Sequence, residues 1–174
     1  MNEMPVDTKS NPWKPSLNDE GRLDIRNKVV FSIDPIGSLD IDDAISFETL
    51  KPSGSRNLEY ELGVHIADAS YFILPESASD LEARKRGNTI YLADRRFNMV
   101  PEILSENICS LRSGSPRYAV SVIWKLDESY NVLSVWFGRT LIKSVSEMSY
   151  ESAQYILNGS GLFPSGEIDI MESD

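Results

Sequence analysis

Residues Phe31 to Ser46 read Phe-Ser-Ile-Asp-Pro-Ile-Gly-Ser-Leu-Asp-Ile-Asp-Asp-Ala-Ile-Ser, and this stretch holds four aspartates close together in the chain. They are Asp34, Asp40, Asp42 and Asp43. The apolar run from Val29 to Ile33 predicts a buried strand before them, and Ala44 begins a second one. Pro35 and Gly37 bend the chain between the two strands. We therefore expect the four carboxylates to lie near one another at one end of a sheet.

Carboxylates held close together raise one another's pKa or recruit a cation. Carboxylate oxygens are ligands that Mg²⁺ prefers, and Mn²⁺ can take its place. Two such ions roughly 3.5–4 Å apart can activate a water and stabilise the leaving oxygen of an in-line displacement at phosphorus. The aspartates therefore predict a divalent-metal site that acts on a phosphate.

The stretch has three alternative interpretations. The first is an acidic surface loop, since aspartate is common in turns, but Leu39 and Ile41 would draw this loop toward the core. A calcium-binding EF-hand loop is excluded, because Ile45 and Lys51 stand where it needs glycine and glutamate. Asp40-Ile41-Asp42 also fits a metal-dependent glycosyl- or nucleotidyl-transferase. That enzyme would need a nucleotide-binding strand, loop and helix before the motif, which the short polar N-terminus does not supply.

The composition is that of a globular domain with an acidic balance. The chain has 174 residues, 41% of them hydrophobic, and a net charge of −10. No apolar run is long enough to cross a bilayer, and the N-terminus lacks the features of a signal peptide, so no membrane partner is expected. A single cysteine, Cys109, excludes an intramolecular disulfide and is compatible with a reducing compartment. The charge argues against nucleic-acid binding through a global positive field, and leaves open binding through a local basic strip and metal ions.

The order of predicted elements indicates an α+β fold with a mixed, largely antiparallel sheet and flanking helices. A polar arm or linker, residues 1–24, comes first, and Trp13 could pin it to the body. An acidic tail, residues 159–174, comes last and is expected to be disordered or truncated. The expected strands cover 29–33, 44–50, 58–67, 117–126 and 132–140, and the loop 51–57 joins an antiparallel pair. The expected helices begin at Ser79 (capped with Glu82), at Pro101 and at Ser149.

His65 lies in the expected strand 58–67, and Asp68 follows directly after its end. A lone histidine in a strand is more often structural than catalytic. His65 lies on the opposite face from Val64 and Ile66, however, and that face could look onto the aspartate loop, so a phosphate or ribose contact is also predicted. Asp68 could join that contact or cap the following turn.

Basic and aromatic residues follow. Arg84, Lys85 and Arg86 form either a solvated helix face or a strip that tracks phosphates. Tyr91 and Phe97 flank Arg95 and Arg96, a pattern that suits stacked bases and phosphates, although core packing of the rings is the ordinary alternative.

Several ordered blocks resemble the catalytic domain of the ribonuclease II family, the RNB domain, whose members are processive 3′→5′ exoribonucleases. The family motif is a strand, an aspartate, five residues and Asp-x-Asp-Asp-Ala. Asp34 and Asp40 to Ala44 match it in full. Further matching blocks are Gly63 to Asp68, Tyr91-Leu92, Met99 to Ser105 with Cys109 to Leu111, Ala119 to Trp124 and Tyr150 to Leu157. The resemblance covers about residues 25–158 and is strongest to the eukaryotic exosome-type, Dis-like members, with a cytoplasmic paralogue as the nearest type.

The resemblance implies roles for single residues. The four aspartates are similar to the magnesium-binding carboxylates, and Asp42 to the one most tied to catalysis. Tyr91 matches the tyrosine that stacks on the 3′-terminal nucleotide. The implied reaction is metal-assisted hydrolysis of the last phosphodiester, which releases nucleoside 5′-monophosphates. The implied partners are the 3′ end of single-stranded RNA and the exosome core, in the cytoplasm or the nucleus.

One departure from the family pattern concerns length. The family's catalytic domain is considerably longer, and OB-type domains flank it. We therefore expect this chain to be an incomplete fragment, the N-terminal half of an RNB-like domain, with little or no nuclease activity by itself. The alternative is a non-catalytic RNB-like module that binds RNA or an exosome component.

Overall fold

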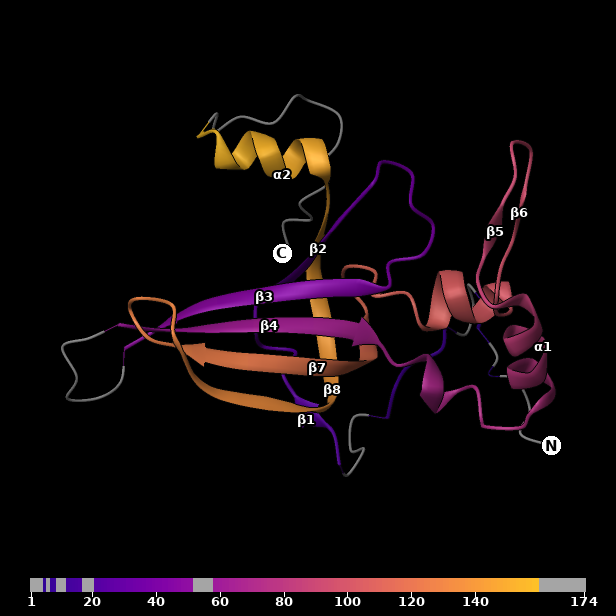
Figure 1. Cartoon of the computed structure of the whole chain (residues 1–174), viewed down its shortest axis with the longest axis horizontal. Coiled ribbons are helices and arrows are strands. Elements are labelled where there is room, and N and C mark those ends of the chain that lie inside the picture. The colour runs from indigo at the N-terminus through magenta and orange to yellow at the C-terminus, as the bar shows by residue number, and fades with distance from the viewer. Residues whose placement is uncertain (1–4, 6, 9–11, 17–20, 52–57, 160–174) are drawn as a thin grey trace.

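The computed structural model describes residues 5, 7–8, 12–16, 21–51 and 58–159 (Figure 1). The strands are β1 Leu23–Asp24, β2 Val30–Asp34, β3 Asp43–Leu50, β4 Glu59–Ala67, β5 Ile90–Tyr91, β6 Arg96–Phe97, β7 Pro116–Leu126 and β8 Val132–Ser149. The α-helices are α1 Ala78–Arg86 and α2 Tyr150–Leu157; a 3₁₀ turn covers Ala69–Tyr71 and a π-helical turn covers Ile103–Ile108. Within these residues, no helix is long and apolar enough to cross a membrane.

Six strands form one mixed sheet in the order β1-β8-β2-β3-β4-β7, and β8 also pairs with β7. The pairs β2–β3, β3–β4, β4–β7 and β7–β8 are antiparallel, whereas β8 runs parallel to β1 and β2. The 18 residues of β8 allow this double role, because its first part pairs with β7 and its last part with β2. Figure 1 shows β3, β4 and β7 side by side, with β8 running along β7 and then turning to pass behind the three strands toward α2. The expected α+β class with a mixed, largely antiparallel sheet is confirmed.

The main core lies against one face of the sheet. Its buried apolar members come from strands and loops: Ile25, Val30, Ile41, Ala44, Leu111, Ala119, Ile123 and Ile142. A second cluster forms around Leu104 and Ile108, and Trp13 packs against it. Trp13 also meets Phe72 and Tyr118 edge to face, with ring centroids 5.1 and 5.6 Å away. These contacts bring the N-terminal segment onto the body.

The structure corrects two details of the predicted elements. The cap of α1 is Ser77, whose hydroxyl accepts from the Asp80 N–H, so the helix begins two residues earlier than the Ser79–Glu82 pattern predicted. The strand expected over 132–140 is longer than predicted, because β8 continues unbroken to Ser149. The loop 52–57 and the residues 160–174 of the predicted acidic tail lie outside the described residues.

Candidate functional site

The acidic loop, residues 34–43, joins the end of β2 to the start of β3. Asp34 is the last residue of β2, and Asp43 is the first residue of β3. The loop turns at Gly37, where φ is +82°, a conformation that glycine adopts without strain. Because β2 and β3 are neighbouring antiparallel strands, both ends of the loop lie at the same end of this strand pair.

Backbone hydrogen bonds fix the second half of the acidic loop. The Ile41 N–H donates to the Ser110 hydroxyl at 2.9 Å, and the Ile41 carbonyl accepts from the Leu111 N–H at 2.8 Å. The Asp42 carbonyl accepts from the Ala67 N–H at 2.8 Å. Ile41 is buried, as its apolar character predicted, whereas Leu39 is exposed. The backbone that carries Asp40, Asp42 and Asp43 is therefore anchored to the core.

The carboxylates of the acidic loop interact with one another. Burial raises the pKa of Asp34 above its usual value, and the charges of Asp43, Glu147 and Asp40 raise it further. Desolvation likewise raises the pKa of Asp42, followed by the charges of Asp40, Asp43 and Asp34. One oxygen of Asp34, Oδ2, is buried without a hydrogen-bond partner. A group of anions that destabilise one another beside an unpaired oxygen is an arrangement that a cation would relieve.

The chemistry of this donor set fits a divalent cation, but the side chains do not form a finished metal site. Carboxylate oxygens are the ligands that Mg²⁺ and Mn²⁺ prefer. Among the residues that the structure describes, no group of three or more His, Cys, Asp or Glu side chains is arranged to hold a metal ion. Asp40 accounts for part of this, because its Oδ1 accepts from Arg96 at 3.0 Å.

Glu147 is an acidic neighbour of the loop that sequence reasoning missed. The parallel pairing of β2 with β8 sets Glu147 beside Ser32 and Ser149 beside Asp34. A cavity of about 200 Å³ opens there, and its lining includes Asp34, Glu147 and Ser149. No local motif marks Glu147, because its closeness to Asp34 depends entirely on the register of two strands far apart in the chain.

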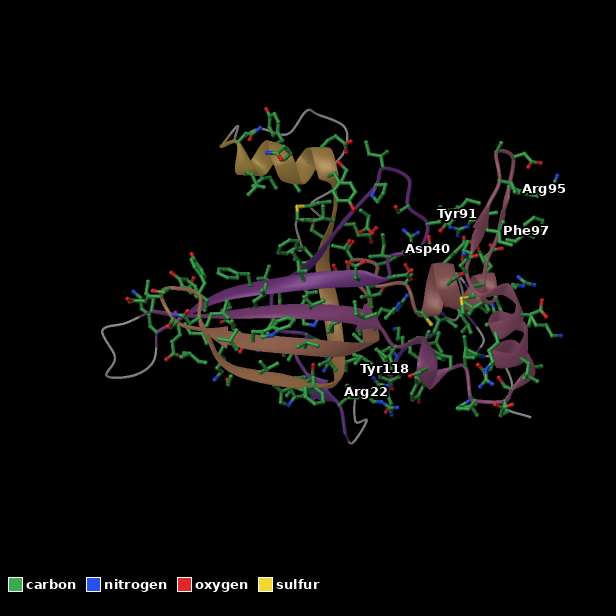
Figure 2. All side chains as sticks on the ribbon, in the orientation of Figure 1. Arg22, Asp40, Tyr91, Arg95, Phe97 and Tyr118 are labelled. Atoms are coloured by element: carbon green, nitrogen blue, oxygen red, sulfur yellow. The ribbon has the colours of Figure 1, made fainter. Side chains whose placement is uncertain are left out.

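The β5–β6 hairpin carries Tyr91, Arg95 and Arg96. Tyr91 is 69% exposed, so its ring is available to a ligand. In the register of the hairpin Tyr91 pairs with Arg96, and directly opposed residues lie on the same face of a strand pair. Arg96 reaches Asp40 from that face. Figure 2 shows Tyr91 on the side of the hairpin toward Asp40, with Arg95 toward the tip. The structure therefore brings Tyr91 and Arg96 to the acidic loop.

His65 does not reach this site, which corrects its predicted phosphate or ribose contact. Its side chain is fully buried. Nδ1 lies 2.7 Å from the Ser121 hydroxyl, and Nε2 lies 3.0 Å from the Ser46 hydroxyl. Burial lowers the pKa of His65 to about 4. A neutral imidazole with both nitrogens paired inside the protein has no atom to offer RNA, so its role is structural.

Asp68 is likewise a structural residue, and its predicted RNA contact is wrong. It is 2% exposed, and Oδ2 forms an ion pair with Arg22 at 2.7 Å. Oδ1 accepts from the Ser70 hydroxyl at 2.6 Å. These donors outweigh burial and hold the pKa of Asp68 below its usual value. The Arg22 guanidinium also lies 3.8 Å from the ring centroid of Tyr118. Arg22, directly before β1, joins this part of the chain to Asp68 and to the Ala119 and Thr140 carbonyls of the sheet, a role that no sequence pattern signalled.

The basic residues of α1 are mostly paired within the protein. Arg84 forms ion pairs with Glu76 and Asp80, and Arg86 pairs with Glu82. The geometry therefore favours a solvated helix face over a strip that tracks phosphates.

Comparisons of the sequence with known proteins identify a domain family and several relatives. The model of the RNB domain matches residues 22–165. "DIS3-like exonuclease 2" from Arabidopsis thaliana is 44% identical over 149 residues, which cover 85% of this chain and 14% of the relative. A protein from the same plant named "Inactive exonuclease DIS3L2" matches with the same identity and coverage. "Probable exosome complex exonuclease RRP44" from Caenorhabditis elegans is 43% identical over 84% of this chain and 15% of the relative.

Solved structures show the same fold. RNase R of Mycoplasma genitalium in complex with double-stranded RNA superposes with a TM-score of 0.77 at 28% identity, over 95% of this chain and 27% of that one. The same enzyme with ribose-methylated single-stranded RNA gives a TM-score of 0.74 at 29% identity, over 85% and 22%. The chain thus spans about one seventh of the length of the curated relatives that it matches.

Proposed function

This chain belongs to the RNB domain family, and on that premise we propose that it forms the acidic, RNA-end-binding part of a 3′→5′ exoribonuclease. The observation that carries the proposal is the acidic loop itself. Burial, together with the charges of neighbouring carboxylates, raises the pKa values of Asp34 and Asp42 beside an unpaired Asp34 oxygen, where a cation would relieve the repulsion.

In the proposed mechanism Asp34, Asp40, Asp42 and Asp43 would hold Mg²⁺, or Mn²⁺ in its place. Such an ion, when bound, lowers the pKa of a coordinated water and offsets negative charge on the phosphate. The residues of the chain bind and orient the RNA. Tyr91 stacks its exposed ring on the 3′-terminal base, at the hairpin face toward the acidic loop. Hydrolysis consumes one water and yields a nucleoside 5′-monophosphate and a shortened RNA with a 3′-hydroxyl end.

The proposal extends to the partners and to the isolated chain. The proposed ligand is the 3′ end of single-stranded RNA, and the exosome core is a proposed partner because several relatives are named as exosome nucleases. Little or no hydrolysis is expected from the 174-residue chain alone, because the aligned part is only a small share of each relative.

The test is Asp42→Asn in the complete gene product that contains this chain. We expect shortening of a 5′-labelled single-stranded RNA to fall at least about a hundredfold, while RNA affinity changes by less than about threefold. EDTA should abolish shortening by the unsubstituted protein. Asp24→Asn is the matched control, since Asp24 is an exposed aspartate paired with Arg26 away from the acidic loop. Full activity of the Asp42→Asn protein would refute the proposal.

A second candidate function is a non-catalytic module that binds RNA or an exosome component. Two observations favour it: an equally similar relative is named inactive, and no three carboxylates of the described residues stand ready to hold an ion. The same experiment separates the two functions. RNA that is bound but never shortened by the unsubstituted protein, with Mg²⁺ present, would favour the binding module.

A further inference from the structure

Two neighbouring arginines on the β5–β6 hairpin have opposite surroundings. The Arg95 side chain is 63% exposed, and its ion pair is with the adjacent Asp94. The Arg96 side chain is only 19% exposed and forms ion pairs with Asp40 and Glu106, which are distant in sequence. An arginine whose two terminal nitrogens both donate to carboxylates is poorly placed to bind an RNA phosphate as well.

Glu106 holds Arg96 in place. It lies in the π-helical turn Ile103–Ile108, next to the buried Leu104 and Ile108. Its Oε1 accepts from Arg96 Nη2 and from Asn98 Nδ2. The Arg96 guanidinium holds the pKa of Glu106 below its usual value. Glu106 is therefore a fixed anionic anchor for the base of the hairpin and for Arg96.

The hairpin depends on such anchors because its own pairing is minimal. Each of its strands has two residues, and Ile90, Leu92 and Phe97 are all exposed. An isolated two-stranded hairpin is marginally stable at best in water. Arg96 extends from the same hairpin face as Tyr91 and forms an ion pair with Asp40. This ion pair therefore determines how that face is oriented relative to the acidic loop.

We propose that Arg96, anchored by Glu106, is a positioning residue that fixes Tyr91 against the acidic loop, and that Arg95 is the arginine of the pair that contacts the RNA backbone. The inference rests on the proposed function, since it assigns Tyr91 to an RNA 3′ end. It replaces the initial prediction that both arginines bind RNA with a division of roles.

The experiment measures the affinity of the chain for a 5′-labelled oligoadenylate at several salt concentrations and a fixed Mg²⁺ concentration. A phosphate contact on single-stranded nucleic acid contributes about 0.7 to the slope of log affinity against log salt. Arg95→Ala should therefore lower the slope by about 0.7. Arg96→Ala should leave the slope unchanged, and should weaken binding by about tenfold through misplacement of Tyr91.

The affinity of a double variant provides a second test. Tyr91→Ala should also weaken binding by about tenfold. If Arg96 acts through Tyr91, the double variant should bind no worse than Tyr91→Ala alone. Hydrogen exchange of the hairpin amides, measured without RNA, should be faster in Arg96→Ala than in Arg95→Ala. Glu106→Gln repeats the test without touching the hairpin, in case Arg96→Ala does not fold.

The outcomes distinguish this inference from the proposed function. If the unsubstituted chain binds no RNA, the proposed function fails and the inference fails with it. If the chain binds RNA and Arg96→Ala lowers the salt slope as Arg95→Ala does, or if the losses of Arg96→Ala and Tyr91→Ala add in full, the inference alone is overturned.

Discussion

Aspartates in the protein interior and in the acidic loop have opposite surroundings, and their pKa values shift in opposite directions. In the sheet interior, Asp68 is buried but has Arg22 and Ser70 as partners, and its pKa is lowered. In the acidic loop, Asp34 and Asp42 have one another and further anions as neighbours, and their pKa values are raised. The same residue type thus stabilises one region and strains the other. The difference distinguishes an acid that stabilises the fold from acids whose charge costs stability, and the latter are the ones that the proposed function assigns to a ligand.

The largest effect is expected from Asp68→Asn, which tests whether the buried ion pair stabilises the fold. The substitution keeps the shape of the side chain but removes the carboxylate charge that lies 2.7 Å from the buried Arg22 guanidinium. We expect a loss of about 3–5 kcal/mol in the free energy of unfolding. Urea denaturation followed by circular dichroism measures it. A loss below about 1 kcal/mol would show that the ion pair does not hold the sheet interior together.

The next largest effect is the pH dependence that comes from His65. Its pKa is about 4 in the folded protein against a usual value of 6.5, so the unfolded chain binds the proton more readily. The stability from keeping His65 neutral is complete above pH 6.5 and is lost as the pH falls toward 4. The loss should reach about 3 kcal/mol at most. Since His65 is the sole histidine of the chain, its NMR signal can be followed alone, and a midpoint near 6.5 would contradict the prediction.

A third prediction concerns Gly63, beside His65 in the sheet interior. A Cβ at this position would lie 2.4 Å from the Ser46 hydroxyl and 2.8 Å from His65 Nε2. Gly63→Ala should therefore cost about 1–3 kcal/mol of unfolding free energy. Adding Ser46→Ala should recover part of the loss, because it removes the nearer clash. Thermal unfolding of the single and double variants measures both effects, and an unchanged Gly63→Ala midpoint would rule out tight packing here.

The smallest effect, with the opposite sign, is expected from Asp42→Asn. The pKa of Asp42 is raised, so its charge costs stability at neutral pH, and the cost disappears as the pH falls through its folded pKa. Because Asp42 is exposed, solvent screens the repulsion, and the variant should be more stable by less than about 1 kcal/mol at pH 7. The gain should vanish at low pH. A clear loss of stability at pH 7 would place Asp42 with Asp68 among the residues that serve the fold.

Much of the fold was predictable because its signals are local. The apolar runs predicted β2, β4 and β7, and the order of elements predicted the class of sheet. The spacing of the aspartates predicted that one loop would carry all four. The roles of Glu106 and Glu147 were not predictable, because no local motif marks either residue: Glu106 acts through its ion pair with Arg96, and Glu147 lies near Asp34 only through the register of β2 and β8.

The sequence by itself determined the family, the strand pattern and the concentration of four carboxylates in one loop, since neighbours in the chain stay neighbours in any fold. Only the tertiary structure decided which polar groups are paired. It paired His65 with hydroxyls from two other strands and Asp68 with Arg22 and Ser70, and it placed Asp34 and Asp42 beside further anions. It also joined Arg96 to Asp40 and Glu106, while Arg95 pairs with the adjacent Asp94. The physical reason is that desolvation and ion pairing depend on which distant segments meet, and strand register sets those meetings.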